Sequence, residues 1–510
     1  MAPLEYKEYG IVKKIRGCIV EVEGLKNCIN GQVIRFGPGT EGIIMGFTGD
    51  SSGVLLIKDK NPPKTGDRAT MTLKPYDTPV GEEFVGRVIN VLGEPLDNLP
   101  PIEPKHYAAI FPTVPSVLER GPVATTLETG ISTLDAVIPI GRGQRQLVLG
   151  DKMTGKTVIG TDIVLNQKGK GVKCVYCCIG KSTTALDRLV ALLKSRGALE
   201  YSIVIAALAG RSPGQQYLAP YVACSMGEYF MYKGGHVVVV FDDFTKHAWA
   251  YREVSLLMGR PPGRESYPGD VFYLHSRMIE RAAQMSDELG GGSMTFFPMV
   301  ELLEGDVTGY VPTNLISMTD GQILLDTELF SEGFKPAVDI GLSVSRIGSK
   351  VQWKAMKKVA AKLRLKYIQY RQKLQMAKMQ SGEQSKEFKE QMKEGEILTE
   401  LLTQDKNNPR HMVHQVALFY AVDKRLFMHL NNDQVRKIKL NIFPYIQEKY
   451  PDLIRELSEK KDIDESVTAQ LDKLWEEYIG MIEKESEEAA ENAKNAERPA
   501  EASEETVEQS

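Results

Sequence analysis

Cysteine is scarce in this chain, long apolar runs are absent and the net charge is small. Six cysteines among 510 residues show no disulfide-framework spacing, which favours a reducing compartment. No run of about 18 apolar residues occurs, so the sequence predicts no membrane-spanning helix. The beginning, MAPLEYKEYG, predicts neither a signal peptide nor an Arg-rich transit peptide. A net charge of −4 is too near zero for a protein whose whole surface binds nucleic acid or anionic lipid.

The composition is that of a folded protein with several domains. Hydrophobic residues make up 42% and charged residues 25% of the chain, which excludes disordered and collagen-like classes. At about 150 residues per domain, the length predicts roughly three domains. Residues 483–510 contain ten glutamates against three lysines or arginines. The remainder of the chain is therefore close to neutral.

The pattern of apolar residues changes along the chain. Short alternating segments between glycine turns predict a small antiparallel β-barrel over residues 1–73. Continuous apolar strands such as RQLVLG, VKCVYCCIG, YSIVIAAL and HVVVVFDD, interleaved with helices, predict a mostly parallel sheet in an α/β domain over residues 74–345. Helical spacing predicts an α-helical bundle over 346–482. The aperiodic segment 483–510 is predicted to be a disordered acidic tail.

The strongest local motif is GDKMTGKT at residues 150–157, which follows the strand RQLVLG and precedes the helix TVIGTDIVLNQ. The spacing G-x-x-x-x-G-K-[ST] is typical of a P-loop in a RecA-like domain, where glycines turn backbone N–H groups onto phosphate oxygens. Lys156 is predicted to reach the terminal phosphates, and the Thr157 hydroxyl to ligate Mg²⁺. The alternative is a tight strand-to-helix turn with an incidental Lys-Thr pair.

Two carboxylates, Asp242 and Asp243, end the four-valine strand. A carboxylate at the carboxyl end of a buried strand is well placed to hold a metal's water shell, which makes Asp242 the predicted Mg²⁺ residue. The alternative, a helix cap, suits Asp243 better. Hydrolysis also needs a group that activates water, but the second apolar strand is followed by Lys181, with no acid before Asp187. Since a protonated lysine cannot accept a proton, the site is predicted to bind nucleotide without turning it over.

Five further segments are distinctive: IPIGRGQRQLVLGD at 138–151, QQYLAPYVACSMGEYF at 215–230, RPPGRESYPGDVFYLHSRMIERAA at 260–283, GDVTGYVPTNLISMTDGQILLDTELF at 305–330 and PAVDIGLSVSRIG at 336–348. With these segments the chain resembles one family, the alpha subunit of the F-type rotary ATP synthase. The resemblance covers roughly residues 9–480. It is specific for alpha, because the segment 260–283 is alpha-like and the catalytic beta subunit carries a glutamate where this chain has Lys181.

The resemblance implies an assembly of three alpha and three beta subunits that alternate around a central gamma shaft. Each alpha subunit is expected to bind ATP or ADP with Mg²⁺ without hydrolysing it. Arg346, in the motif SVSRIG, is expected to enter the catalytic site of a neighbouring beta subunit as an arginine finger, and activity is expected to depend on Ser343 as well. Without the resemblance, Arg346 would be interpreted as a salt-bridge partner after a strand.

The resemblance also implies the residues that bind the nucleotide. They lie in the phosphate-binding loop of residues 150–157, the cradle, and in a pocket for the base. The chain departs from the family pattern at Lys152, Met153, Lys181, Lys335 and Lys406, where the family has Arg or Gln. The full predicted set is Gly150, Asp151, Lys152, Met153, Thr154, Gly155, Lys156, Thr157, Val158, Asp242, Ser317, Phe330, Lys335, Pro336, Gln404 and Lys406, with Thr157 and Asp242 on the metal.

The family further implies a peripheral complex on the cytoplasmic face of the cell membrane that couples ATP synthesis to proton transport, with a mitochondrial inner-membrane form as the alternative. Membrane contact is expected only through partners, and no nucleic acid is expected. The family normally has a helical segment before the barrel that binds a delta-type stator subunit, whereas about eight residues precede Tyr9 here. The alternatives are a specialised rotary ATPase motor without that attachment, a self-sufficient hexameric NTPase, and a subunit whose nucleotide site has decayed.

Three weaker signals favour structural interpretations. The run CVYCC at 174–178 favours a buried strand over a metal site. His411 and His414 are too few ligands for a metal and favour a solvated helix face. The basic run between residues 354 and 366 keeps a helical period, which favours an amphipathic helix over nucleic-acid binding.

Overall fold

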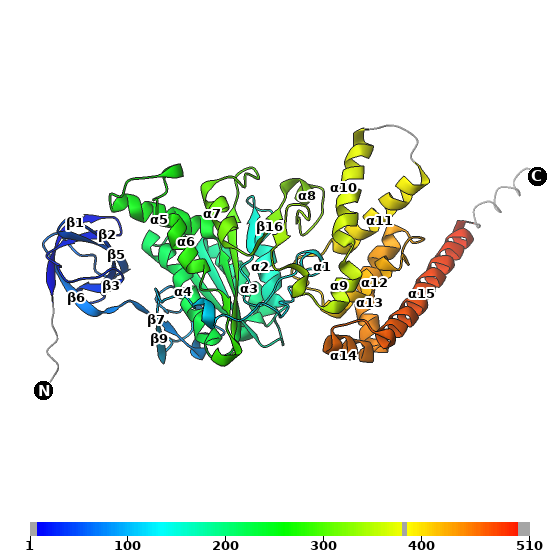
Figure 1. The fold of residues 1–510 in the computed structure, drawn as a ribbon, viewed down its shortest axis with the longest axis horizontal. Helices are drawn as coiled ribbons and strands as arrows, with labels where there is room; N and C mark the ends of the chain where they lie inside the picture. The colour runs from blue at the N-terminus through cyan, green and yellow to red at the C-terminus, as the bar shows by residue number, and fades with distance from the viewer. Residues whose placement is uncertain (1–7, 380–384, 498–510) are drawn as a thin grey trace, which may run out of the picture. The chain divides into compact units, whose positions relative to one another are not determined.

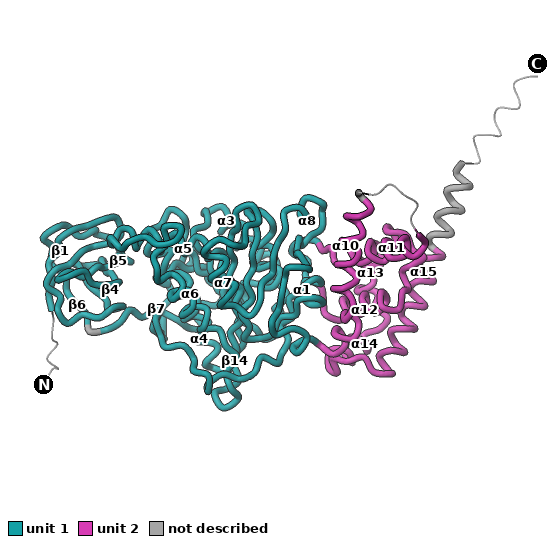
Figure 2. The backbone as a smooth tube through the Cα atoms, turned by 45° about the horizontal axis from the view of Figure 1, so that its top comes forward, with its two compact units in different colours: residues 1–352, 405–409 teal, residues 353–404, 410–510 magenta. Residues whose placement is uncertain are grey.

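A computed structural model describes residues 8–379 and 385–497 of the chain (Figure 1). They form two compact units, one of residues 1–352 and 405–409 and the other of residues 353–404 and 410–510 (Figure 2). The first unit contains a β-barrel and an α/β domain, and the second is α-helical. The predicted architecture of barrel, nucleotide-type sheet and helical region is confirmed.

Six antiparallel strands close the barrel in the order β1-β2-β5-β4-β3-β6. Val20, Ile44 and Val54 belong to the cluster that fills its interior. Their neighbours Ile43 and Leu55 belong to the core shared with the α/β domain, because successive side chains of a strand point to opposite faces. The strands are β1 (Tyr9–Arg16), β2 (Ile19–Glu23), β3 (Gln32–Gly37), β4 (Thr40–Thr48), β5 (Ser51–Asp59) and β6 (Arg68–Pro75).

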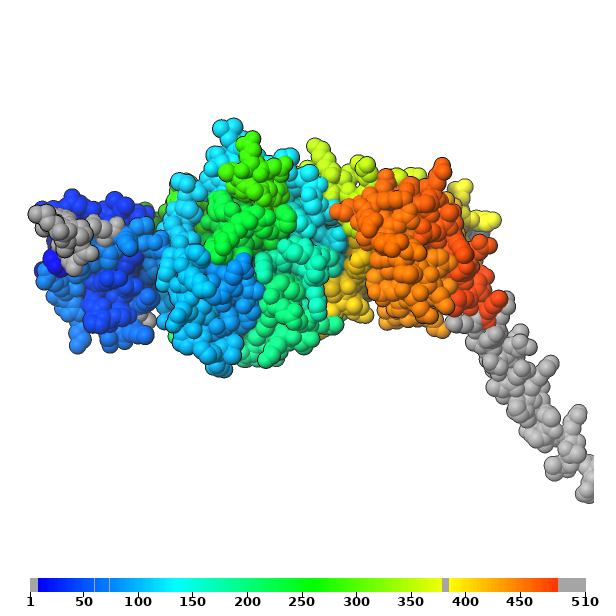
Figure 3. All heavy atoms as spheres, turned by 90° about the horizontal axis from the view of Figure 1, so that it is seen from below, coloured from blue at the N-terminus to red at the C-terminus, as the bar shows by residue number. Residues whose placement is uncertain are grey.

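The barrel packs directly against the α/β domain, as the dark and lighter blue surfaces of Figure 3 show. Gly214, in the first turn of α4 (Pro213–Met231), lies so close to the barrel that an added Cβ would be 2.9 Å from the Leu55 side chain. Arg260 donates a hydrogen bond of 2.7 Å to the carbonyl of Met45. These contacts join the barrel and the sheet into one unit.

The α/β domain is built on a nine-stranded sheet with the order β17-β16-β10-β15-β13-β11-β12-β8, to which β14 adds at β15. The strands from β16 to β8 are parallel, and β17 and β14 are antiparallel. A separate hairpin pairs β7 (Asp77–Val80) with β9 (His106–Ala109). The sheet strands are β8 (Val88–Ile89), β10 (Leu147–Gly150), β11 (Val172–Lys181), β12 (Ser202–Leu208), β13 (His236–Asp242), β14 (Ala283–Gln284), β15 (Ser293–Glu301), β16 (Gly321–Leu325) and β17 (Val344–Ser345).

Helices cover both faces of this sheet, which explains why its strands are apolar throughout. One buried cluster contains residues of α1 (Ser132–Val137), α2 (Lys156–Leu165) and α3 (Thr183–Ser195). The other contains residues of α4, α5 (Phe244–Leu257), α6 (Val271–Ile279) and α7 (Tyr310–Met318). The three cysteines of β11 are buried in these clusters, and no cluster of three or more metal-binding side chains occurs among the described residues.

The second unit is a helical bundle whose helix α12 is buried on all sides. The prediction of a solvated face is wrong for His414, which is 7% exposed and whose Nε2 lies 3.1 Å from the carbonyl oxygen of Lys439. A helix that is apolar all round lies inside a bundle. The helices are α9 (Lys354–Ala360), α10 (Leu363–Met379), α11 (Lys386–Leu402), α12 (Met412–Asp423), α13 (Asn432–Lys449), α14 (Pro451–Lys460) and α15 (Glu465–Glu497).

Helix α15 extends into the segment predicted as a tail, as far as Glu497. Alanine, glutamate and lysine, which are strong helix formers, are frequent there. Residues 498–510 of the predicted tail lie outside the described residues. Within the described ranges, no helix is long and apolar enough to cross a bilayer.

A buried ion pair joins helix α4 to the segment after α6 in the α/β domain. Glu228 of α4 accepts two hydrogen bonds of 2.6 Å from the guanidinium of Arg281, and both residues are at most 5% exposed. Arg281 also donates to the carbonyl of Ile110 at 3.0 Å. The pair therefore ties α4 to the segment after α6 and to the loop after β9.

We expect Glu228→Gln to destabilise the α/β domain by about 3–5 kcal/mol, because it leaves a buried guanidinium without its counter-charge. The matched control is Glu82→Gln, which removes an exposed carboxylate 3.9 Å from Lys173 and should cost less than about 1 kcal/mol. Urea unfolding followed by circular dichroism measures both. Equal losses in the two variants would contradict the assignment.

Candidate functional site

The loop of residues 150–157 connects β10 to α2 at the carboxyl edge of the sheet. Gly155 has a φ of +107° as the N-cap of α2, and Met153 has a φ of +67°. This left-handed backbone turns the loop around the amino end of the helix, which is an anion-binding arrangement. The Lys156 ammonium lies within the loop and donates to the carbonyls of Gly150 at 2.7 Å and Asp151 at 2.5 Å.

The Asp151 side chain ties this loop to the start of α8 (Thr327–Ser331). Its carboxylate accepts hydrogen bonds from the Gly305 N–H at 2.8 Å and from the Thr327 hydroxyl at 2.9 Å. Helix α8 also carries Phe330, whose ring centroid lies 4.6 Å from the Lys335 ammonium. The structure thus connects the cradle to the segment with the predicted base-pocket residues Phe330 and Lys335, the latter followed by Pro336.

Thr157 and Asp242 come together from α2 and β13. The Thr157 hydroxyl donates a hydrogen bond of 2.7 Å to Asp242 Oδ2, which also accepts one of 3.1 Å from the Tyr176 hydroxyl. Thr157 thereby keeps its oxygen lone pairs for another ligand. A hydroxyl and a carboxylate are oxygen donors that fit Mg²⁺, whose other ligands are commonly phosphates and water. Both predicted metal residues therefore lie where such an ion could be held.

Lys181 lies against the same carboxylate. Its ammonium is 2.6 Å from Asp242 Oδ1 and 3.6 Å from Asp243 Oδ2. Burial opposes the charge on Lys181, but the two carboxylates outweigh burial and raise its pKa above the ordinary value. Asp243 is also the N-cap of α5, where it accepts from the Lys246 N–H at 2.8 Å, in agreement with the capping alternative. Burial raises the Asp243 pKa, and Lys181 opposes that rise.

Glu301 is a residue of the site that the sequence reasoning missed. It ends β15 and pairs in register with Gly150 of β10. Burial lowers the pKa of Lys156, and the carboxylate of Glu301 is the strongest influence opposing that shift. The rule that selected Asp242, a carboxylate at the carboxyl end of a buried strand, would also have selected Glu301.

Arg346 lies at the opposite edge of the sheet from the cradle. It follows β17, whose Ser345 pairs with Gly321 at the start of β16, whereas Gly150 pairs with Leu325 at the end of β16. Four residues of strand separate these positions by about 13 Å. Arg346 is exposed, and its guanidinium donates to the carbonyl of Ile316 at 3.2 Å.

Ser343, on which activity was predicted to depend, is buried, and Ser317, which was predicted to bind the nucleotide, lies on α7. Ser343 is fully buried, and its hydroxyl accepts a hydrogen bond of 2.9 Å from the Leu324 N–H. This bond links the segment before β17 to strand β16. Ser317 lies near the end of α7, where its hydroxyl donates to Asn314 at 2.6 Å. Since α7 leads to the amino end of β16, Ser317 is near Arg346 and not near the cradle. The local sequence around Ser317 does not show the direction in which the strands run. This is why Ser317 was predicted to lie at the nucleotide.

An ion-pair network that the sequence did not indicate supports Arg346. Arg145 forms ion pairs with Asp320 at 2.7 Å and with Glu280 at 2.5 Å. The carbonyl of Asp320 accepts from the Arg346 N–H at 2.7 Å. The network fixes the backbone from which the Arg346 side chain projects.

Gln404 and Lys406 belong to different units. Gln404 is buried and is part of the helical unit, whereas residues 405–409 belong to the unit with the cradle. Asn407, next to Lys406, donates its N–H to Asp162 of α2 at 2.8 Å. Burial raises the pKa of Asp162 to about 7, although this hydrogen bond and Arg196 oppose the rise.

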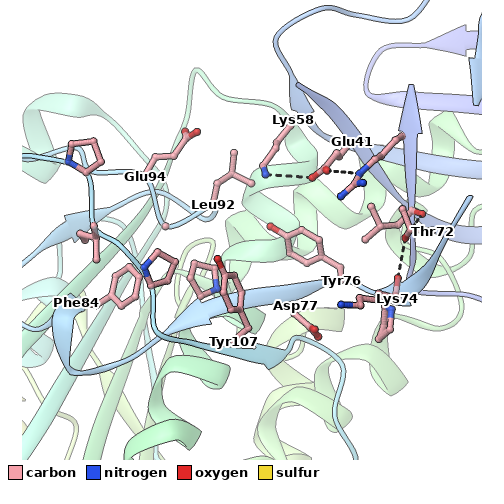
Figure 4. A pocket seen from close by; sticks show the side chains of 18 of the residues that line it. Glu41, Lys58, Thr72, Lys74, Tyr76, Asp77, Phe84, Leu92, Glu94 and Tyr107 are labelled. Atoms are coloured by element: carbon pink, nitrogen blue, oxygen red, sulfur yellow. Dashed lines mark hydrogen bonds and ion pairs between the residues drawn. The ribbon is translucent and has the colours of Figure 1, made fainter. Parts of the chain in front are cut away.

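A separate cavity of about 1080 Å³ lies between the barrel and the α/β domain, away from the cradle. Figure 4 shows Glu41 and Lys58 at its barrel side and Phe84 and Tyr107 at the other. Its lining includes five prolines and three aromatic residues, but none of the predicted nucleotide-binding residues. The phosphate-binding geometry of the loop, and not cavity size, identifies the candidate site.

Comparisons with known proteins agree with the geometry. Residues 130–345 match the nucleotide-binding domain of the ATP synthase alpha/beta family, and residues 352–478 match the C-terminal domain of ATP synthase alpha/beta chains. The chain belongs to the ATP synthase alpha/beta family. The predicted resemblance to this family is thereby confirmed, and its alpha type is confirmed by relatives that are named subunit alpha.

Curated alpha chains of this family are similar over nearly their whole length. The ATP synthase subunit alpha of Caldanaerobacter subterraneus subsp. tengcongensis is 43% identical over 485 residues, which cover 94% of this chain and 96% of that protein. The ATP synthase subunits alpha of Clostridium acetobutylicum and Aquifex aeolicus are each 43% identical, over 475 and 465 residues. These matches cover 93% and 91% of this chain, and 94% and 92% of the relatives.

We expect Lys156→Ala to weaken nucleotide binding by roughly tenfold to a hundredfold, the range of a lost charge-assisted hydrogen bond. Lys152→Ala, in the same loop but exposed, should have a smaller effect. Titration of the full-length chain with a fluorescent ATP analogue measures both. A larger loss in Lys152→Ala would place the phosphates elsewhere.

We expect Asp162 to make the stability of the α/β domain depend on pH. Its folded pKa of about 7 exceeds the ordinary 3.8, so the folded state holds the proton more tightly. The contribution to stability is full below about pH 4 and is lost as the pH rises towards 7, by roughly a few kcal/mol. Urea unfolding at several pH values should show that Asp162→Asn removes this decline. An unchanged decline in the variant would exclude Asp162 as its source.

Proposed function

We propose that this chain is the non-catalytic alpha subunit of a rotary ATP synthase head, which binds ATP or ADP with Mg²⁺ and does not hydrolyse it. The observation that carries the proposal is the Lys181 ammonium beside Asp242, at 2.6 Å, where a catalytic site needs a group that accepts a proton from water. A protonated lysine cannot do this. Bound Mg²⁺ would supply charge neutralisation for the phosphates.

Different residues of the chain are proposed to bind the phosphates, the cation and the base of the nucleotide. The amino end of α2 and Lys156 face the phosphates, and Thr157 and Asp242 provide oxygen ligands for the cation. Phe330, Lys335 and Pro336 follow β16, the neighbour of β10 in the sheet, and are proposed to contact the base. The contact of Asp151 with Thr327 at 2.9 Å supports a pocket that joins these two parts.

We propose that Arg346 acts in a neighbouring beta subunit and not in its own chain. Its exposure, and its place about 13 Å along the sheet from the cradle, support action on a neighbour. Asp320 and Ser343 are proposed as positioning residues, since one bonds the Arg346 backbone at 2.7 Å and the other holds β16 at 2.9 Å. An arginine of this kind stabilises charge on the transferring phosphoryl group.

The assembly proposed for the chain follows from its family. It consists of three alpha and three beta subunits around a gamma shaft, attached as a peripheral complex to the cytoplasmic face of a membrane and coupled to proton transport. A dedicated ATPase motor is the closest variant of the proposal.

A self-sufficient NTPase is the second candidate function, because Glu301 provides a carboxylate at the same edge of the sheet as the cradle. The two functions predict different behaviour of the purified chain. ATP hydrolysis by the chain alone that Glu301→Gln abolishes would favour the second candidate. Bound nucleotide without turnover supports the first.

We expect Arg346→Ala to reduce ATP turnover of the head, assembled with its beta and gamma subunits, by about 10³–10⁵-fold, or roughly 4–7 kcal/mol. Nucleotide bound to the variant chain should be retained. Arg346→Lys is the matched variant, and it should recover little activity because an ammonium lacks the planar fork of a guanidinium. Steady-state hydrolysis and a count of bound nucleotide test this together. Retained turnover would exclude the arginine finger.

A further inference from the structure

The backbone of β11 directs Lys181 into the carboxyl edge of the sheet. The register of β11 against β12 shifts between Ile179 and Lys181, and such a bulge re-aims the side chain that follows it. Gly180 has a φ of +63°, and an added Cβ would lie 3.0 Å from the Lys246 side chain and 3.1 Å from that of Gln216. A larger residue at position 180 would be strained and crowded, so glycine favours the turn that sets the direction of Lys181.

The Lys181 ammonium lies beside two carboxylates that are almost completely buried. Asp242 and Asp243 are each 2% exposed, and the Lys181 ammonium is 2.6 Å from one and 3.6 Å from the other. The Lys181 side chain is 26% exposed. A close pair at this depth is less screened by solvent than a surface pair. The ammonium therefore lies beside the cradle as the ion-pair partner of both carboxylates.

The pair also occupies the carboxylate that a divalent cation would use. Asp242 Oδ2 already accepts hydrogen bonds from Thr157 and Tyr176, at 2.7 and 3.1 Å. Its other oxygen, Oδ1, faces Lys181. A cation whose water shell approached Asp242 would meet a positive charge within a few ångströms, so the ammonium and the metal repel each other there.

We propose that Lys181 acts as a fixed cation that replaces much of the charge of Mg²⁺, so that this chain binds nucleoside di- and triphosphates with little dependence on the metal. The inference rests on the proposed nucleotide-binding function and adds which form of the ligand the site accepts. Lys181 and Lys156 together offset two of three carboxylates at this edge of the sheet, Asp242, Asp243 and Glu301, without a bound metal. Lys181 thereby lowers the negative charge that the phosphates meet.

The experiment compares binding of a fluorescent ATP analogue by the full-length chain in excess EDTA and in excess Mg²⁺. The two dissociation constants of the wild-type chain should differ by less than about threefold. In Lys181→Gln, which is uncharged and of similar length, Mg²⁺ should tighten binding by roughly tenfold or more, the range seen when groups around a metal site change. Mn²⁺ paramagnetic resonance should show tighter metal binding by that variant with nucleotide present.

Two further variants separate charge from general disturbance. Lys181→Arg keeps the charge and should remain weakly dependent on the metal. Lys173→Gln makes the same chemical change on β11, at the opposite end of the strand, and should behave as the wild type. Equal metal dependence in Lys181→Gln and the wild type would overturn the inference.

The wild-type chain provides a test that needs no variant. Binding that Mg²⁺ strengthens by about tenfold or more overturns the role of Lys181 while the proposed function stands. Failure to bind the analogue in either condition contradicts the proposed function itself, and the inference fails with it.

Discussion

The carboxylate of Asp242 is the interaction on which the candidate site depends. It is contacted by Thr157 from α2, by Tyr176 from within β11 and by Lys181 from the end of β11. It thereby joins the start of the cradle helix to two neighbouring strands of the sheet. Because Asp242 is buried, its charge must be balanced where it lies. The lysine supplies that balance, and a protonated lysine at this place cannot itself accept a proton from water.

The direction of the strands separates the two activities proposed for this chain. In a parallel sheet, the carboxyl ends of all strands meet at one edge, and ligands bind there. The cradle, Asp242, Lys181 and Glu301 all lie at that edge. Arg346 follows β17, the outermost strand, which is antiparallel to β16. The chain therefore returns to the edge of the sheet where the parallel strands begin. One sheet can therefore present a nucleotide site on one side and an exposed arginine on another, provided that the arginine acts on a neighbouring subunit.

The sequence predicted the parts of the site that are encoded locally. The cradle depends on a glycine spacing next to a strand and a helix, and Asp242 on its place at the end of a valine run. The contact between Lys181 and Asp242 could not be derived in this way, since it requires knowing that β11 and β13 are adjacent although 61 residues of sequence separate their ends at Lys181 and Asp242. The burial of His414 and the position of Ser317 were missed for a related reason, because both depend on neighbouring elements of the fold. The barrel was recognisable from alternation, which extends to its closing strand β6, where Ala69 and Met71 alternate with polar residues.

Strand β16 connects the two edges. At its amino end, Asp320 precedes it and bonds both Arg145 and the backbone of Arg346. At its carboxyl end, Thr327 bonds Asp151 of the cradle. The strand is hydrogen-bonded to β10 on one side and to β17 on the other, so its two ends cannot shift independently of each other. The separation between the nucleotide cradle and the arginine is therefore set by a short strand inside the sheet, and the buried Ser343, which bonds the backbone of Leu324, strengthens that link from the segment that carries Arg346.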